Sequence, residues 1–146
     1  MTRRPIAAML LFLAACSSAA QAATYEMFRD PYCGCCGLWA DHVRDESEVA
    51  VKETVTEDMA RIKQEHRIPQ DLWGCHTMIV DGYIIEGHVP AEQIERLLAE
   101  RPEGVRGIAV AGMPIGSPGM EMGERKQPYQ VIAFGDEGRF VFASYD

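Results

Sequence analysis

The alternation of hydrophobic and polar residues predicts strands in four parts of the chain. These segments are residues 24–30, 49–55, 76–88 and 129–145. The first two alternate apolar and polar side chains, as strands with one buried face do. In the third, two apolar runs are joined by Asp81 and Gly82, a dipeptide that tolerates the positive φ of a tight turn, so a β-hairpin is expected there. The fourth repeats this arrangement around the sequence GDEG and predicts a second hairpin.

Apolar residues at helical spacing predict three helices between these strands. The first is short and begins at or just after Cys36. The second follows an N-cap at Thr56 and stops before Pro69, because proline cannot continue a helix. The third takes Pro90 as its first helical residue and ends at Pro102.

Residues 104–123 fit neither period, since they carry six glycines and two prolines. This composition predicts a structured loop or a flexible flap and neither a helix nor a regular strand. The segment also holds Met113, Met120 and Met122. The last two are two positions apart, so in an extended chain their side chains point to one side.

The N-terminal residues have the composition of an export signal. Two arginines precede an apolar run over residues 6–15, which is too short to span a bilayer. An AQA sequence ending at Ala22 predicts a signal over residues 1–22, whereas LAAC ending at Cys16 resembles a bacterial lipobox and would leave that cysteine lipidated. Either alternative predicts a periplasmic domain, residues 23–146, with contact to the outer membrane only through a lipid on the cysteine.

The composition fits one globular domain with an acidic surface. The 146 residues are 47% hydrophobic, which allows a real core, and the sequence shows no internal repeats. The formal net charge is −8, and removal of the two signal arginines takes it to about −10. Such a charge argues against nucleic acid as a partner, because that interaction needs a basic face.

Three cysteines lie within four positions where the first helix begins. Cys33 and Cys36 form a C-x-x-C motif at a helix N-terminus, where backbone N–H groups and the helix dipole favour a thiolate. Disulfide, redox dithiol and metal site are all open for such a motif in an exported chain. A bridge between the adjacent Cys35 and Cys36 would be strained, so the feasible pairings are Cys33 with Cys36, or one of the three with Cys75.

The extra sulfurs favour metal binding over a simple dithiol. A redox pair needs two sulfurs, whereas Cys35 and Cys75 bring the count to four. Soft thiolates favour Cu(I), with Zn(II) as the less favoured competitor, and because thiolates bridge, a multinuclear copper cluster is an open alternative.

Histidines and methionines are the further candidate ligands. His76, next to Cys75, is the stronger histidine candidate, and His88, beyond the hairpin, is the weaker one; a structural role is the alternative for each. Thioether sulfur suits Cu(I) better than zinc, so the three loop methionines join the predicted metal site, with core filling as their alternative. The complete predicted set is Cys33, Cys35, Cys36, Cys75, His76, Met113, Met120 and Met122.

Residues 75–98, CHTMIVDGYIIEGHVPAEQIERLL, resemble the second half of a glutaredoxin. Together with the element order, this predicts an α/β thioredoxin-like (glutaredoxin-like βαβαββα) sandwich with a C-terminal Gly/Met-rich loop and a β-hairpin extension. The resemblance implies that Cys75 and His76 lie against the three early cysteines. Thioredoxins and glutaredoxins carry a cis-proline at this place, and the GCHT sequence of residues 74–77 has no proline.

The cysteine trio, GCHT, VDGYIIEGHVP and GIAVAGMPIGSPGMEMG together resemble the DUF411 family, over residues 25–143. The resemblance implies a periplasmic, thioredoxin-like copper protein of copper resistance, with Cys33, Cys35, Cys36 and Cys75 as ligands. It implies copper ions and other periplasmic copper-handling proteins as partners, and Cu(I)/Cu(II) interconversion as a role, while leaving enzymatic turnover open. The alternative is a thiol-disulfide oxidoreductase in which Cys33 attacks and Cys36 resolves.

Overall fold

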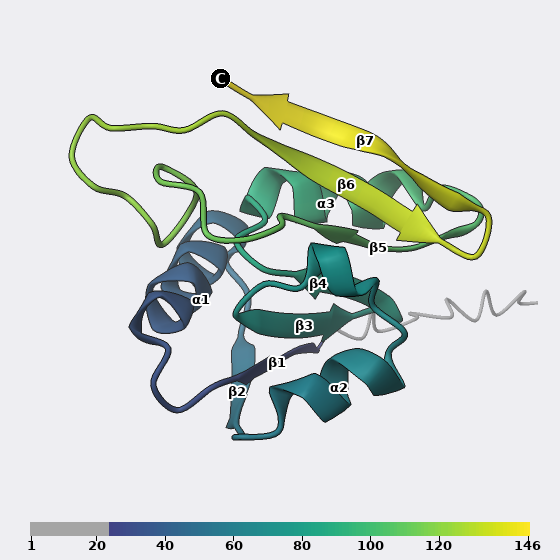
Figure 1. Ribbon diagram of the computed structural model, residues 1–146, viewed down its shortest axis with the longest axis horizontal. Coiled ribbons are helices and arrows are strands. Elements are labelled where there is room, and N and C mark those ends of the chain that lie inside the picture. Colours follow the sequence, from purple (N-terminus) through teal and green to yellow (C-terminus); the bar gives the residue numbers. More distant parts are fainter. Residues whose placement is uncertain (1–23) are drawn as a thin grey trace, which may run out of the picture.

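The computed structural model describes residues 24–146, which are arranged around one seven-stranded sheet (Figure 1). In chain order the elements are β1 (Tyr25–Arg29), α1 (Gly34–Ser47), β2 (Val51–Val55), α2 (Met59–Glu65), the 3₁₀ turn η1 (Gln70–Leu72), β3 (His76–Val80), β4 (Tyr83–Glu86), α3 (Ala91–Glu100), β5 (Val105–Ala109), β6 (Tyr129–Gly135) and β7 (Gly138–Tyr145). The predicted export signal and the lipidation of Cys16 lie outside the described residues.

The strands lie in the order β2-β1-β3-β4-β5-β6-β7. β1 pairs with β2 in parallel and with β3 in antiparallel orientation, and β3 turns directly into β4. β5 then lies parallel to β4, and the β6–β7 hairpin continues the same sheet on its far side. The result is a mixed α/β fold in which the order β-α-β-α-β-β-α agrees with the sequence, while its thioredoxin-like assignment stays a prediction.

Helices cover both faces of the sheet. α1 and α3 contact each other over one face, and α2 packs against β1 and β3 on the other (Figure 1). Trp39 of α1 is fully buried in the first of these layers, where its indole N–H donates to the Val89 carbonyl at 2.8 Å. This bond ties α1 to the chain that follows β4, so the start of the helix is held beside the start of β3.

Residues 104–123 are not irregular throughout, and the sequence prediction is wrong at their beginning. Val105–Ala109 forms β5, an inner strand paired with both β4 and β6. Glycines indicated a loop, but Gly107 is required by a close approach, because a Cβ there would collide with the Ile84 carbonyl. The irregular segment begins only after this strand.

Three helix starts differ from the sequence prediction by a few residues. α1 already begins at Gly34, so two of the cysteines lie in its first turn. α2 is capped by Asp58 instead of Thr56, since the Asp58 carboxylate accepts the Arg61 N–H at 3.3 Å. Pro90 is the N-cap of α3 and not its first helical residue.

No helix within residues 24–146 combines the length and the apolar character needed to cross a membrane.

Candidate metal centre

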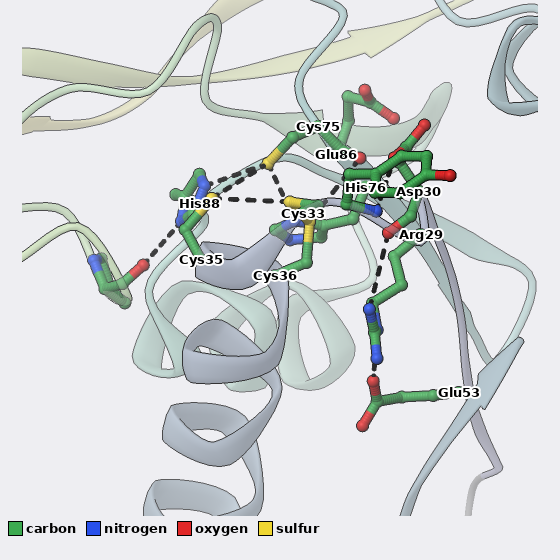
Figure 2. Close-up of a disulfide and its surroundings, with 12 residues drawn as sticks. Arg29, Asp30, Cys33, Cys35, Cys36, Glu53, Cys75, His76, Glu86 and His88 are labelled. Carbon is green, nitrogen blue, oxygen red and sulfur yellow. Dashed lines mark hydrogen bonds and ion pairs between the residues drawn. A yellow bond between two sulfur atoms is a disulfide. The ribbon is translucent and has the colours of Figure 1, made fainter. Parts of the chain in front are cut away.

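A tight turn after β1 delivers the first three cysteines. The Asp30 side chain accepts the Tyr32 N–H at 2.8 Å, and the Asp30 carbonyl accepts the Cys33 N–H at 3.2 Å. Cys33 is therefore fixed as the residue that precedes α1, and Cys36 lies one helical turn further on. The two form a disulfide, one of the pairings that the sequence left open (Figure 2).

The remaining two cysteines are free and lie beside this disulfide. The Cys35 sulfur is 3.5 Å from that of Cys33 and 4.0 Å from that of Cys75, which arrives from the segment before β3 (Figure 2). All four sulfurs lie within 4.8 Å of one another. Metal–sulfur bonds of about 2.3 Å place the sulfurs of a tetrahedral site about 3.8 Å apart. The spacing therefore suits soft metal ions once the disulfide is reduced.

A second donor set shares Cys75 with the first. The Cys75 sulfur lies 3.4 Å from Nδ1 of His76 and 3.1 Å from Nε2 of His88. The ligand atoms of these three residues also lie within 4.8 Å of one another. Cys75 is thus common to a four-sulfur set and to a set with two nitrogens, and these nitrogens extend the range of ions that the centre suits.

His88 is oriented by the glycine-rich loop. Its Nδ1 lies 2.7 Å from the Pro118 carbonyl oxygen, which can only accept, so Nδ1 carries the proton. In the neutral imidazole this leaves the Nε2 lone pair facing the Cys75 sulfur. A backbone carbonyl that fixes the tautomer in this way is typical of metal-ligating histidines.

His76 is packed between an aromatic ring and the other histidine. Its ring centroid is 4.2 Å from that of Trp39 and 5.1 Å from that of His88. The side chain is completely buried, and Nε2 has no hydrogen-bond partner. A buried imidazole held by packing, with one nitrogen against a cysteine sulfur, has the geometry of a preformed ligand.

Burial keeps this second set uncharged. It lowers the pKa of both His88 and His76, and for His76 the closeness of the second imidazole and of the Lys63 ammonium adds to the effect of burial. Burial and the neighbouring Cys35 raise the pKa of the Cys75 thiol to about 12. Neutral imidazole is the form that binds metal, whereas the Cys75 proton has to leave when a metal arrives.

The three predicted methionines are not placed alike. Met113 is half-exposed and shares a shallow hollow of about 250 Å³ with Cys75. Met120 lies in a turn in which its N–H donates to the Ser117 carbonyl. Met122 is half-exposed, and the Arg125 guanidinium donates to its sulfur at 3.4 Å. Of the three, Met113 lies on the same hollow as Cys75, and ligation by any of them stays a prediction.

The predicted ligand set includes His76 and omits His88, the weaker candidate, although both side chains lie against the Cys75 sulfur. The signal was present in the EGHVP sequence, since a histidine just past a hairpin strand lies at the same end as the residue that starts the hairpin. The Pro118 carbonyl could not be identified, because a backbone acceptor carries no side-chain signature.

Comparisons with known proteins identify one matching family and two similar solved structures. Residues 72–120 match the model of a family described as a protein of unknown function, DUF411. A solved structure titled copper resistance protein CopG, form 2, is 38% identical with a TM-score of 0.80, covering 86% of this chain and 100% of the other. Form 1 is 40% identical with a TM-score of 0.78, covering 84% and 96%. No curated protein sequence matches the chain.

The chain belongs to the DUF411 family. The segment that matches the DUF411 model contains Cys75, His76, His88 and Pro118, and therefore the whole second donor set. The cysteine turn precedes that segment, and the likeness to the two CopG structures extends over most of the chain.

Proposed function

We propose that this protein binds copper in copper resistance and homeostasis, with Cu(I) held by Cys33, Cys35, Cys36 and Cys75. The observation that carries the proposal is the gathering of four sulfurs within 4.8 Å from two distant segments. Thiolates select Cu(I), and their ability to bridge suits a multinuclear cluster better than a single zinc ion. The likeness to structures titled copper resistance protein favours copper over zinc as well.

The same residues supply electrons for Cu(II)/Cu(I) interconversion. Oxidation of the Cys33 and Cys36 thiols to their disulfide releases two electrons and two protons, which reduces two Cu(II) ions to two Cu(I) ions. The imidazoles of His76 and His88 suit Cu(II), and Cys75 links them to the sulfur set. Reduction of the disulfide by an external thiol would restore the starting state.

The setting of this function follows from the N-terminal sequence and the charge. We expect a periplasmic, thioredoxin-like domain that exchanges copper with other periplasmic copper-handling proteins. The net charge of −8 suits a basic docking surface on such partners.

The test is an anaerobic titration of the reduced protein with Cu(I) against a competing chelator. We expect a dissociation constant far below about 1 μM. The Cys33→Ser/Cys36→Ser variant should lose most of this affinity, whereas the matched Ser47→Ala/Ser144→Ala variant, remote from the site, should keep it. Affinity at or above the micromolar range, or equal affinity of the double cysteine variant, would contradict the proposal.

A second candidate is a thiol-disulfide oxidoreductase, which the Cys33–Cys36 disulfide at the start of α1 favours. Insulin reduction separates the two functions through Cys35. An oxidoreductase needs only Cys33 and Cys36, so Cys35→Ser should keep its turnover, while the copper protein should lose affinity with the same substitution and show little insulin reduction.

A further inference from the structure

A buried ion pair lies directly behind the second donor set. Lys63 of α2 and Glu86 at the end of β4 pair through Nζ and Oε1, with side chains only 4% and 0% exposed. Burial raises the pKa of the Glu86 carboxyl, and Lys63 opposes this effect. Buried ion pairs contribute little net stability compared with apolar side chains of the same volume. The pair therefore calls for an explanation other than stability.

The Glu86 carboxylate binds the chain on both sides of the Cys75–His76 dipeptide. Its Oε1 accepts the Gly74 N–H at 2.6 Å, and its Oε2 accepts the Thr77 hydroxyl at 2.7 Å. Lys63 completes the network by donating to the Thr77 oxygen at 3.0 Å.

Glu86 also belongs to the segment that carries His88, two residues further on. The two segments touch at their backbones, since a Cβ on Gly74 would lie 2.6 Å from the Cα of Gly87. The Gly87 N–H donates to the His76 carbonyl at 3.0 Å. One carboxylate thus connects all three members of the donor set, although it contacts none of the ligand atoms.

We propose that Glu86 is a positioning residue that sets the spacing of Cys75, His76 and His88 for copper, with Lys63 as the counter-ion that allows its burial. This inference rests on the proposed function, because it takes copper as the ion that binds to Cys75, His76 and His88. The hydrogen bonds to Gly74 and Thr77 do the positioning, and the charges of the pair do not. Partners that orient ligands in this way typically contribute about 10- to 100-fold in metal affinity.

Two charge-neutral double variants separate positioning from charge. In Lys63→Met/Glu86→Gln, the glutamine amide oxygen can still accept from Gly74, and its NH₂ can donate to Thr77. In Lys63→Met/Glu86→Leu, both bonds to the flanks are lost at similar volume. Neither variant leaves an unpaired buried charge, so both should fold, which urea denaturation checks.

The leucine variant should lose about 10- to 100-fold in Cu(II) affinity, whereas the glutamine variant should stay within about threefold of wild type. A metal-free readout is the alkylation rate of Cys75 in the reduced protein. Cleavage after Arg67 and Arg96 gives a peptide in which Cys75 is the sole cysteine, so its rate is measured separately. We expect at least about a threefold faster rate in the leucine variant and wild-type rates in the glutamine variant, since the segment opens more often without its anchor.

Equal affinities and alkylation rates of the two folded variants would overturn the positioning role. If both variants lost Cu(II) affinity to the same extent, the loss would be due to the missing charges of the ion pair. That result would also overturn the positioning role of Glu86. A wild-type protein that binds no copper would instead contradict the proposed function, and the alkylation rates would still decide whether Glu86 positions Cys75.

Discussion

The candidate metal centre joins two regions, the cysteine turn (residues 30–36) and the hairpin end (residues 74–77 and 86–88), which hold their ligands in different ways. The cysteine turn lies at a helix start, is partly exposed and has formed a disulfide. The hairpin end is largely buried, its two histidines are neutral, and it is anchored by Glu86 and by the Pro118 carbonyl. One region can change its covalent state, while the other keeps its geometry, and Cys75 connects them.

The largest expected effect comes from the sulfur that the two donor sets share. Cys75→Ser removes a ligand from both sets, whereas Cys35→Ser removes one from the four-sulfur set alone. Anaerobic Cu(I) and aerobic Cu(II) titrations should show a loss of at least about 100-fold for Cys75→Ser with both ions, since a direct ligand contributes more than its supporting partners. For Cys35→Ser the loss should be confined to Cu(I); equal profiles would show that the sets are not distinct.

Acid should destabilise the metal-free protein through the hairpin end. The pKa values of His76 and His88 are lowered in the folded state, so below the unfolded pKa of about 6.5 the unfolded chain binds more protons. Stability is therefore full above that pH and is lost as the pH falls toward the folded pKa values. The free energy of unfolding, from urea denaturation of the reduced protein, should fall by about 1.4 kcal/mol per pH unit for each histidine.

His88→Gln removes one of these two groups and serves as the control for that pH series. Its slope should be about half that of wild type over the pH range in which both native histidines are neutral. An unchanged slope would mean that His88 titrates in the same way folded and unfolded.

The same substitution should separate the two oxidation states of copper. Imidazole suits Cu(II), so His88→Gln should weaken Cu(II) binding about tenfold and change Cu(I) binding less than about threefold. His66→Gln, at the end of α2 and outside both donor sets, is the matched control. Equal losses for both ions would place His88 in a single mixed site instead.

The smallest effect tests the contact of the loop with α1. A Cβ on Gly119, next to Pro118, would lie 2.7 Å from the Trp39 amide nitrogen, whereas Gly123 has open space around it. Both glycines have positive φ, so Gly123→Ala controls for backbone strain. Urea denaturation should show Gly119→Ala to cost about 1 kcal/mol more than its control. Equal costs would show that the loop is free to shift.

The sequence predicted the elements with strong local patterns and failed where tertiary contacts decide. The hairpin around Asp81 and Gly82 was confirmed, because its turn chemistry and alternating strands agree. The sequence does not predict β5, because VRGIA is neither an alternating pattern nor an apolar run and Gly107 indicates a loop. That glycine is explained only by the neighbouring strand, which lies far away in sequence.

The candidate site divides in the same way. The cysteine turn was recognisable because three cysteines lie within four positions, and the resemblance of residues 75–98 to a glutaredoxin implied that Cys75 lies beside them. The burial of Lys63 and Glu86 could not be predicted, since charged side chains are ordinarily solvated. Their burial depends on how α2 packs across the sheet, which no local pattern contains.

The contact between the rings of Trp39 and His76, with centroids 4.2 Å apart, also gives the protein an intrinsic optical reporter. A copper ion bound at His76 would lie close enough to the indole to quench its fluorescence. Trp73 is the other tryptophan of the chain, and Trp73→Phe would leave Trp39 as the sole source of tryptophan emission. Filling of the histidine-containing set could then be followed in real time, without a label, as a decrease in emission.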